Sequence, residues 1–197
     1  MLGPVMVLHL IFRLLHFAAA IGLFAAVLVE VVTVHYAQRA QTPARLRWAT
    51  EALPIRRALE WPALIFILTS GLGMVLGGWG WRWPWIDASL IAIAFLAWSS
   101  VVVGRALGRI VTLADQGTLE PDAAVTAGGR GLHLLVQLRA GVFFGSILLM
   151  MMRPGLTGTV VILGGTIAGW MLVANRRAQG GHTHPPAPTA EPVPARH

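Results

Sequence analysis

Five long apolar stretches, separated by charged or polar segments, dominate the pattern of the chain. A helix needs roughly 20 mostly apolar residues to cross a bilayer, because in hydrocarbon the backbone must satisfy its own hydrogen bonds. The predicted spans cover about residues 14–35, 61–78, 88–104, 131–152 and 156–173. The pattern therefore predicts an all-α protein, a polytopic membrane bundle of five transmembrane helices over residues 1–177.

Two of these stretches carry charge, which makes them more informative than the others. The first is helical in pattern from Val5 to Tyr36, which is too long for one upright crossing. We therefore expect Arg13 to mark the membrane boundary. The fourth stretch contains Arg139, with uncharged and mostly apolar residues on both sides. We interpret it as a span with an arginine at membrane depth.

Small residues recur at four-residue spacing in four of the spans. Such positions let two helix backbones approach closely in a membrane bundle, so we expect them at helix contacts. They are Ala18, Gly22 and Ala26 in the first span, Gly73 and Gly77 in the second, Gly141 and Gly145 in the fourth, and Gly165 and Gly169 in the fifth.

Composition supports the membrane assignment. Of the 197 residues, 56% are hydrophobic and only 12% are charged, whereas a soluble domain carries about 25% charged residues. This excludes an ordinary soluble enzyme. Cysteine is absent, which excludes disulfides, zinc–cysteine sites and thiol nucleophiles.

The positive charge is distributed unevenly, and the distribution predicts orientation. The net charge is +7, and every basic residue other than histidine is arginine. Cytoplasmic loops carry an excess of positive charge. Three segments lie on the same side when the spans alternate: the one between spans one and two, the one between spans three and four, and the C-terminal segment. They hold Arg39, Arg45, Arg47, Arg56, Arg57, Arg105, Arg109, Arg130, Arg176, Arg177 and Arg196.

The opposite loops hold only Arg82 and Arg153. We therefore predict an N-terminus outside and a C-terminus inside, in a bacterial inner (cytoplasmic) membrane. The lipid bilayer is then the expected partner of the basic residues, and no nucleic-acid partner is implied.

The last residues differ in composition from the rest. Residues 178–197 contain five prolines and no apolar run, so we expect a disordered, Pro- and His-containing cytoplasmic tail. Its His182 and His184 supply only two ligands, which is a poor metal site. We predict no metal site from the sequence.

Ionisable residues at membrane depth usually face the bundle interior and have a partner. Glu30 and Arg139 both fall on the cytoplasmic side of the midplane, about 8 Å and about 4 Å from it at 1.5 Å per residue. The sequence therefore predicts an intramembrane ion pair between them. It leaves open whether such a pair is structural or takes part in a proton or substrate relay.

Histidines in membrane bundles often hold haem, and three are candidates here: His16, His35 and His133. A single iron cannot join His16 to His133, because these two lie at opposite depths. His35 and His133 share a depth near the cytoplasmic boundary. The alternative is that each is a hydrogen-bonded packing residue.

A series of short motifs resembles a family of small bacterial integral membrane proteins of uncharacterised function. More distantly, the chain is similar to the HemJ and CopD families, over about residues 5–155. The motifs are LHFAA at 15–19, VHYA at 34–37, RRALE at 56–60, WPA at 61–63, TSG at 69–71, WIDASL at 85–90 and MMRP at 151–154.

These resemblances imply different chemistries. HemJ is a membrane protoporphyrinogen oxidase, and similarity to it implies a haem b held by the first-span histidine, which is His16. Similarity to CopD implies copper handling. Met150, Met151 and Met152 are consecutive, so on a helix they point in different directions and cannot jointly hold one ion.

The sequence contains no serine–histidine–acid spacing, phosphate-binding glycine loop or metal-ligand signature. We predict no catalytic residues from it. The leading hypothesis is a small polytopic membrane protein that is a subunit or partner of a larger membrane assembly, or a homo-oligomer. The alternatives are a haem-binding oxidoreductase resembling HemJ and a copper-handling protein resembling CopD.

Overall fold

The computed structural model describes residues 4–38, 43–115 and 130–180, and their regular structure is entirely helical. This confirms the all-α prediction. The helices are α1 (Pro4–Gln38), α2 (Pro43–Met74), the π-helix η1 (Val75–Trp79), α3 (Pro84–Asp115), α5 (Arg130–Met152) and α6 (Leu156–Gly180).

Five of the described helices are long and apolar enough to cross a membrane, which confirms the predicted number of spans. The candidate spans are Met6–His35, Glu51–Gly77, Pro84–Arg109, Gly131–Met152 and Leu156–Val173. Many large apolar side chains on them are exposed, as expected where lipid rather than water covers the surface. The protein is therefore a multi-pass membrane protein.

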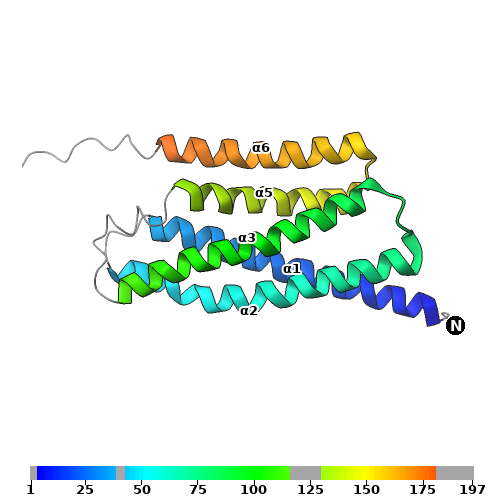
Figure 1. Ribbon diagram of the computed structural model, residues 1–197, viewed down its shortest axis with the longest axis horizontal. Helices are drawn as coiled ribbons and strands as arrows, with labels where there is room; N and C mark the ends of the chain where they lie inside the picture. The colour runs from blue at the N-terminus through cyan, green and yellow to red at the C-terminus, as the bar shows by residue number, and fades with distance from the viewer. Residues whose placement is uncertain (1–3, 39–42, 116–129, 181–197) are drawn as a thin grey trace, which may run out of the picture.

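The helices lie side by side in one elongated bundle (Figure 1). Helix α1 packs chiefly against α2, and α5 packs against α6 and α3. The main core cluster includes Leu23 of α1, Ile67 of α2, Leu96 of α3 and Phe143 of α5. Helix α6 lies at one edge of the bundle, and most of its span faces outward.

The start of α2 differs from the sequence prediction. The segment between spans one and two was expected to be a loop with five arginines, but α2 begins at Pro43 and continues through Pro54 and Pro62. Arg56 and Arg57 therefore lie on a helix, and Arg56 is 1% exposed. The prediction that Arg56 lies in a cytoplasmic loop was therefore wrong. Arg56 can lie inside the bundle because the carboxylates of Glu30 and Glu60 neutralise its charge.

Two corners at the same end of the bundle, near the start of α1, have defined backbone geometry (Figure 1). Arg153 ends α5 in the left-handed region, with φ of 45°, and its N–H donates to the Leu149 carbonyl at 2.9 Å. Pro154 follows and cannot continue the helix. Gly80 ends η1 with a φ of 67°, which favours glycine, and its N–H donates to the Val75 carbonyl at 2.9 Å.

Two of the predicted small-residue positions make the α5–α6 contact. A Cβ added at Gly141 would lie 3.0 Å from the Ile167 Cα, and one at Gly145 would lie 2.6 Å from the Thr166 Oγ1. The expectation was wrong for Gly165 and Gly169, because no atom lies within 4 Å of a Cβ built there. The close approach therefore comes from glycines of α5 alone.

We expect Gly141→Leu to destabilise the protein by about 1–3 kcal/mol, because the new side chain would overlap the α6 backbone. Gly165→Leu is the matched control: it makes the same change in helix propensity, but its side chain points into open space. The measurement is the thermal unfolding midpoint in detergent. Equal midpoints for the two variants would contradict the observed α5–α6 packing.

Candidate functional site

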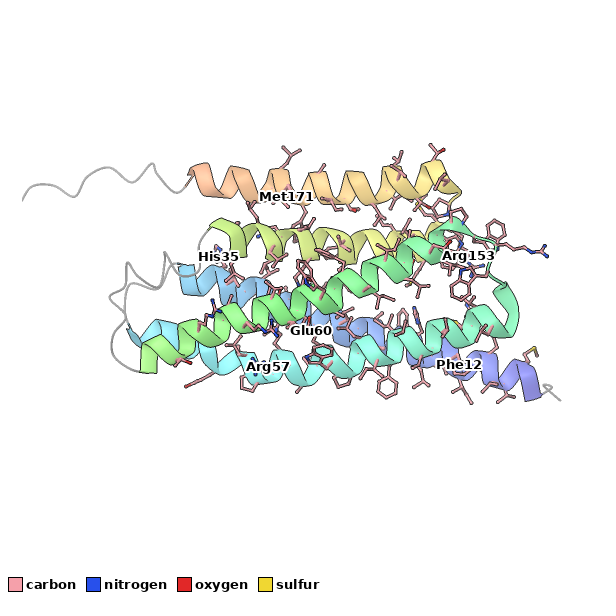
Figure 2. The ribbon with its side chains drawn as sticks, viewed as in Figure 1. Phe12, His35, Arg57, Glu60, Arg153 and Met171 are labelled. Atoms are coloured by element: carbon pink, nitrogen blue, oxygen red, sulfur yellow. The ribbon has the colours of Figure 1, made fainter. Side chains whose placement is uncertain are left out.

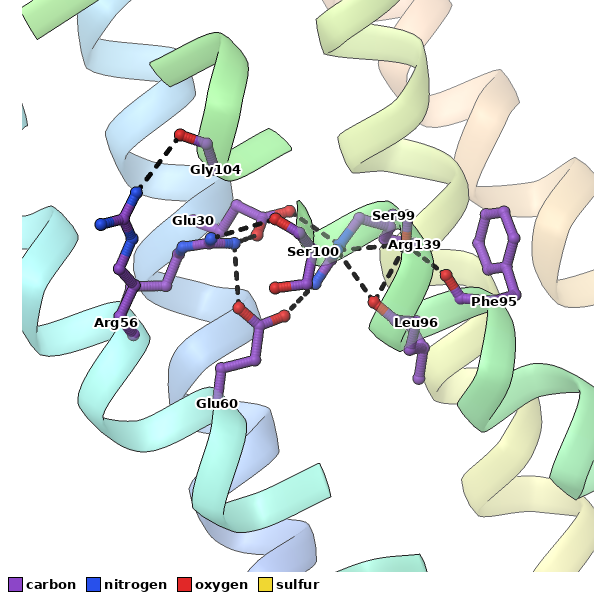
Figure 3. Close-up of polar contacts among 10 residues, drawn as sticks. Glu30, Arg56, Glu60, Phe95, Leu96, Ser99, Ser100, Gly104 and Arg139 are labelled. Atoms are coloured by element: carbon purple, nitrogen blue, oxygen red, sulfur yellow. Dashed lines mark hydrogen bonds and ion pairs between the residues drawn. The ribbon is translucent and has the colours of Figure 1, made fainter. Parts of the chain in front are cut away.

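Four charged side chains meet inside the bundle and form what we call the ionic cluster: Glu30 of α1, Arg56 and Glu60 of α2, and Arg139 of α5 (Figure 3). None is more than 1% exposed. The Arg139 Nε lies 2.9 Å from the Glu30 Oε1, and the Arg56 Nη1 lies 3.0 Å from the Glu60 Oε2. Arg56 also pairs with Glu30, and Arg139 with Glu60. The structure thus brings Glu30 and Arg139 together.

Helix α3 completes the cluster with uncharged acceptors. The Arg139 Nη1 donates to the Ser99 Oγ at 3.1 Å and to the Leu96 carbonyl at 3.2 Å. The Arg56 Nη2 donates to the Ser100 carbonyl at 3.5 Å. Four helices are therefore joined by one polar network.

The arrangement of charge favours a structural role over a relay. Two carboxylates and two guanidinium groups give zero formal charge, and each carboxylate contacts both arginines. Charges at membrane depth are tolerated when they are paired in this way. Every charge of the cluster therefore has two partners of opposite sign, as expected of a structural network that joins helices.

Sequence reasoning identified only half of this cluster. The sequence prediction assigned Arg56 to the loop before span two, and Glu60 directly precedes that predicted span. Their spacing of four was the available signal, because it places both side chains on one helix face. Arg56 and Glu60 form a second arginine–glutamate pair, in addition to Glu30 and Arg139. Recognising it would have predicted a cluster of four residues.

We expect Arg139→Met to destabilise the protein by about 3–5 kcal/mol, because it leaves two buried carboxylates sharing one arginine. Arg105→Met is the control, since Arg105 is exposed on α3. Thermal unfolding in detergent measures both. Adding Glu60→Gln to Arg139→Met should recover part of the loss, and an unchanged unfolding midpoint for Arg139→Met would refute the structural role.

The second polar site surrounds His16, towards the other end of α1. The His16 Nδ1 lies 3.0 Å from the Ser70 Oγ of α2, and its Nε2 lies 3.3 Å from the Met150 Sδ of α5. Three helices therefore meet at one imidazole.

The contacts of Ser70 favour the tautomer of His16 that carries its proton on Nδ1. The Ser70 hydroxyl donates to the Phe66 carbonyl, which can only accept. The Ser70 Oγ is then the acceptor for the His16 Nδ1–H. In a neutral imidazole the Nε2 then carries a lone pair, and this lone pair faces a thioether sulfur that has no hydrogen.

Two cavities meet at this histidine. An inner cavity of about 100 Å³ is lined by residues of α1, α2, η1, α3 and α5. A larger one of about 530 Å³ lies against α1 and α5. His16, Met74 and Met150 line both cavities. The helix leaves α geometry directly after Met74, where η1 begins, and such π turns often occur at functional sites.

The other predicted histidines lie elsewhere. His35 is 19 residues from His16 on the same helix, about 28 Å along its axis. Figure 2 shows it at the end of the bundle opposite Arg153. His133 is half-buried near the start of α5. No group of three or more His, Cys, Asp or Glu residues in the described ranges could hold a metal ion. His182 and His184 lie outside those ranges.

The His16–Met150 spacing discriminates between metal groups. With metal–nitrogen and metal–sulfur bonds of about 2.0 and 2.3 Å, ligands on opposite sides of an ion lie about 4.3 Å apart. Haem iron between these two atoms would need that separation, about 1 Å more than the observed 3.3 Å. A trigonal ion needs roughly 3.7 Å. The pair as packed therefore does not fit haem as two axial ligands, and is closer to an ion with a smaller angle between its ligands, as in trigonal or tetrahedral geometry.

No protein-family model matches the chain, and neither the curated proteins nor the solved structures include a significant match. The resemblance to the HemJ and CopD families therefore stays a prediction.

Proposed function

We propose that this protein binds Cu(I) through His16 and Met150 in the outer half of a bacterial inner-membrane bundle. One observation carries the proposal: the His16 Nε2 lies 3.3 Å from the Met150 Sδ. With the imidazole proton on Nδ1, as the Ser70 contact favours, no proton lies between these two atoms. Two acceptors that face each other are unfavourable unless a cation lies between them.

The chemistry of the donors favours copper in its reduced state. Thioether sulfur is a soft ligand that selects Cu(I), and imidazole also suits copper. Met74 lines both cavities beside His16 and offers a second thioether. Ser70 holds the imidazole in the orientation that a metal-binding histidine needs.

The absence of charge among these donors argues for a monovalent ion. Histidine and methionine are neutral ligands, so the charge of the ion would stay uncompensated in a low-dielectric environment. The cost of burying charge rises steeply with its magnitude. A +1 ion is therefore better suited to this site than Zn²⁺ or Cu²⁺.

Only one methionine of the triplet takes part in this proposal. Met151 and Met152 are 76% and 67% exposed, as expected for consecutive helix positions, and only Met150 contacts His16. Copper handling thus depends on one methionine from the triplet together with residues of α1 and α2. A subunit role in a larger membrane assembly, or a homo-oligomer, stays a separate prediction.

The direct test is a titration of the detergent-purified protein with Cu(I), under reducing conditions, against a chromogenic Cu(I) chelator. We expect one Cu(I) per chain and at least a tenfold loss of affinity in Met150→Leu. Ser70→Ala should lose about 10–100-fold, as second-sphere changes do. Met152→Leu, on the same helix but exposed, should bind as the unmodified protein does.

Two results would overturn the copper proposal. One is equal affinity in the Met150→Leu and Met152→Leu proteins. The other is an intense Soret band in protein from haem-replete cells that is lost in His16→Ala, which would assign the histidine to haem instead.

The proposed orientation is supported by the arginine distribution and has its own test. We expect a C-terminal fluorescent protein that matures only in the cytoplasm to be bright, and a C-terminal periplasmic phosphatase to be inactive. The reverse pattern would place the His16 site at the cytoplasmic side.

A further inference from the structure

The larger cavity, of about 530 Å³, has features that the copper site does not use. Beyond His16, Met74 and Met150, its walls come from α1 and α5 and from the corner after α5. Phe17 and Ile21 of α1 line it and are 68% and 56% exposed, so the cavity borders the lipid-facing surface of the bundle. Its volume lies within the range of about 300–1,000 Å³ of small-molecule sites.

The length of the cavity matches one leaflet of a bilayer. It extends along α1 from Arg13 to Phe24, which is 11 residues or about 16 Å. Half of a hydrocarbon core is about 15 Å. Phe24 lies at the deep end, where its ring packs 6.2 Å from Phe143 and 6.1 Å from Phe144. Counted from Arg13 at the predicted membrane boundary, the deep end of the cavity therefore falls near the membrane midplane.

The two ends of the cavity differ sharply in chemistry. Arg13 and Arg153 are the charged residues that line it, and both belong to its outer end. The deeper lining residues Ala20, Phe24 and Ile147 are apolar, and no lining residue is acidic. Arg153 is held at the corner by the hydrogen bond from its N–H to Leu149 and by Pro154.

We propose that this cavity binds one net-anionic phospholipid, with its phosphate at Arg13 and Arg153 and an acyl chain extending inward to Phe24. Guanidinium groups bind phosphate through paired, charge-assisted hydrogen bonds. Two arginines attract a headgroup that carries net negative charge more strongly than a zwitterionic one. The depth of one leaflet and the apolar floor fit a single chain of the same lipid.

The proposal is independent of copper binding, because it depends on the two arginines and the cavity floor rather than on the His16 Nε2. The test is native mass spectrometry of the full-length protein in detergent, with phosphatidylglycerol or phosphatidylcholine added at equal concentration. We expect a one-to-one phosphatidylglycerol adduct that exceeds the phosphatidylcholine adduct at least fivefold.

The variants separate headgroup from chain recognition. Arg13→Gln and Arg153→Gln should each reduce the phosphatidylglycerol adduct about five- to tenfold. Arg82→Gln is the matched control, because Arg82 is also exposed at this end of the bundle but does not line the cavity. Ala20→Phe, which fills the cavity below the arginines, should remove the adducts of both lipids.

Three outcomes would overturn the lipid proposal. The first is equal binding of the two lipids, and the second is an unchanged adduct in both cavity-arginine variants. The third is displacement of the lipid by millimolar inorganic phosphate, which would show that the site recognises the anion alone. Ser70→Ala changes no residue that lines this cavity, so it should leave the phosphatidylglycerol adduct unchanged while it weakens Cu(I), and the two proposals fail separately.

Discussion

The ionic cluster of Glu30, Arg56, Glu60 and Arg139 is the constraint on which the rest of the bundle depends. An unpaired charge at this depth is expensive, so the helices that carry these residues cannot slide or rotate independently. With the acceptors of α3, the cluster fixes α1, α2, α3 and α5 in one register. Apolar packing between helices in lipid is less directional and would allow several registers.

That register also places the second polar site. On α1, His16 lies 14 residues from Glu30, about 21 Å, and on α5 Met150 lies 11 residues from Arg139, about 16 Å. Both distances run towards the same end of the bundle, where Arg153 ends α5 (Figure 2). The ion pair between α1 and α5 thus brings the imidazole and the thioether to similar heights, where they meet. A structural interaction in one half of the bundle thus determines which side chains can converge in the other half.

Much of the fold could be predicted from sequence because membrane spans are local. Apolar runs long enough to cross a bilayer identified all five candidate spans, and two of them, 131–152 and 156–173, have the predicted boundaries. The other three spans are longer than predicted. In α2 the added turns carry charges that are typical of a loop by composition. The His16 site was harder to predict, because no sequence motif marks Ser70 or Met74 as a site residue. Met150 was noticed only as part of a triplet.

The amino-acid pattern alone predicted a multi-pass helical protein in which Glu30 and Arg139 need partners inside the bundle. These conclusions follow from the cost of placing polar groups in hydrocarbon, which depends on each residue and its distance along one helix. Only the tertiary structure decided that Arg56 and Glu60 complete the ionic cluster, and that Ser70 and Met150 surround His16. Those contacts join residues 26 to 134 positions apart, and their geometry depends on how whole helices pack, which no single span encodes.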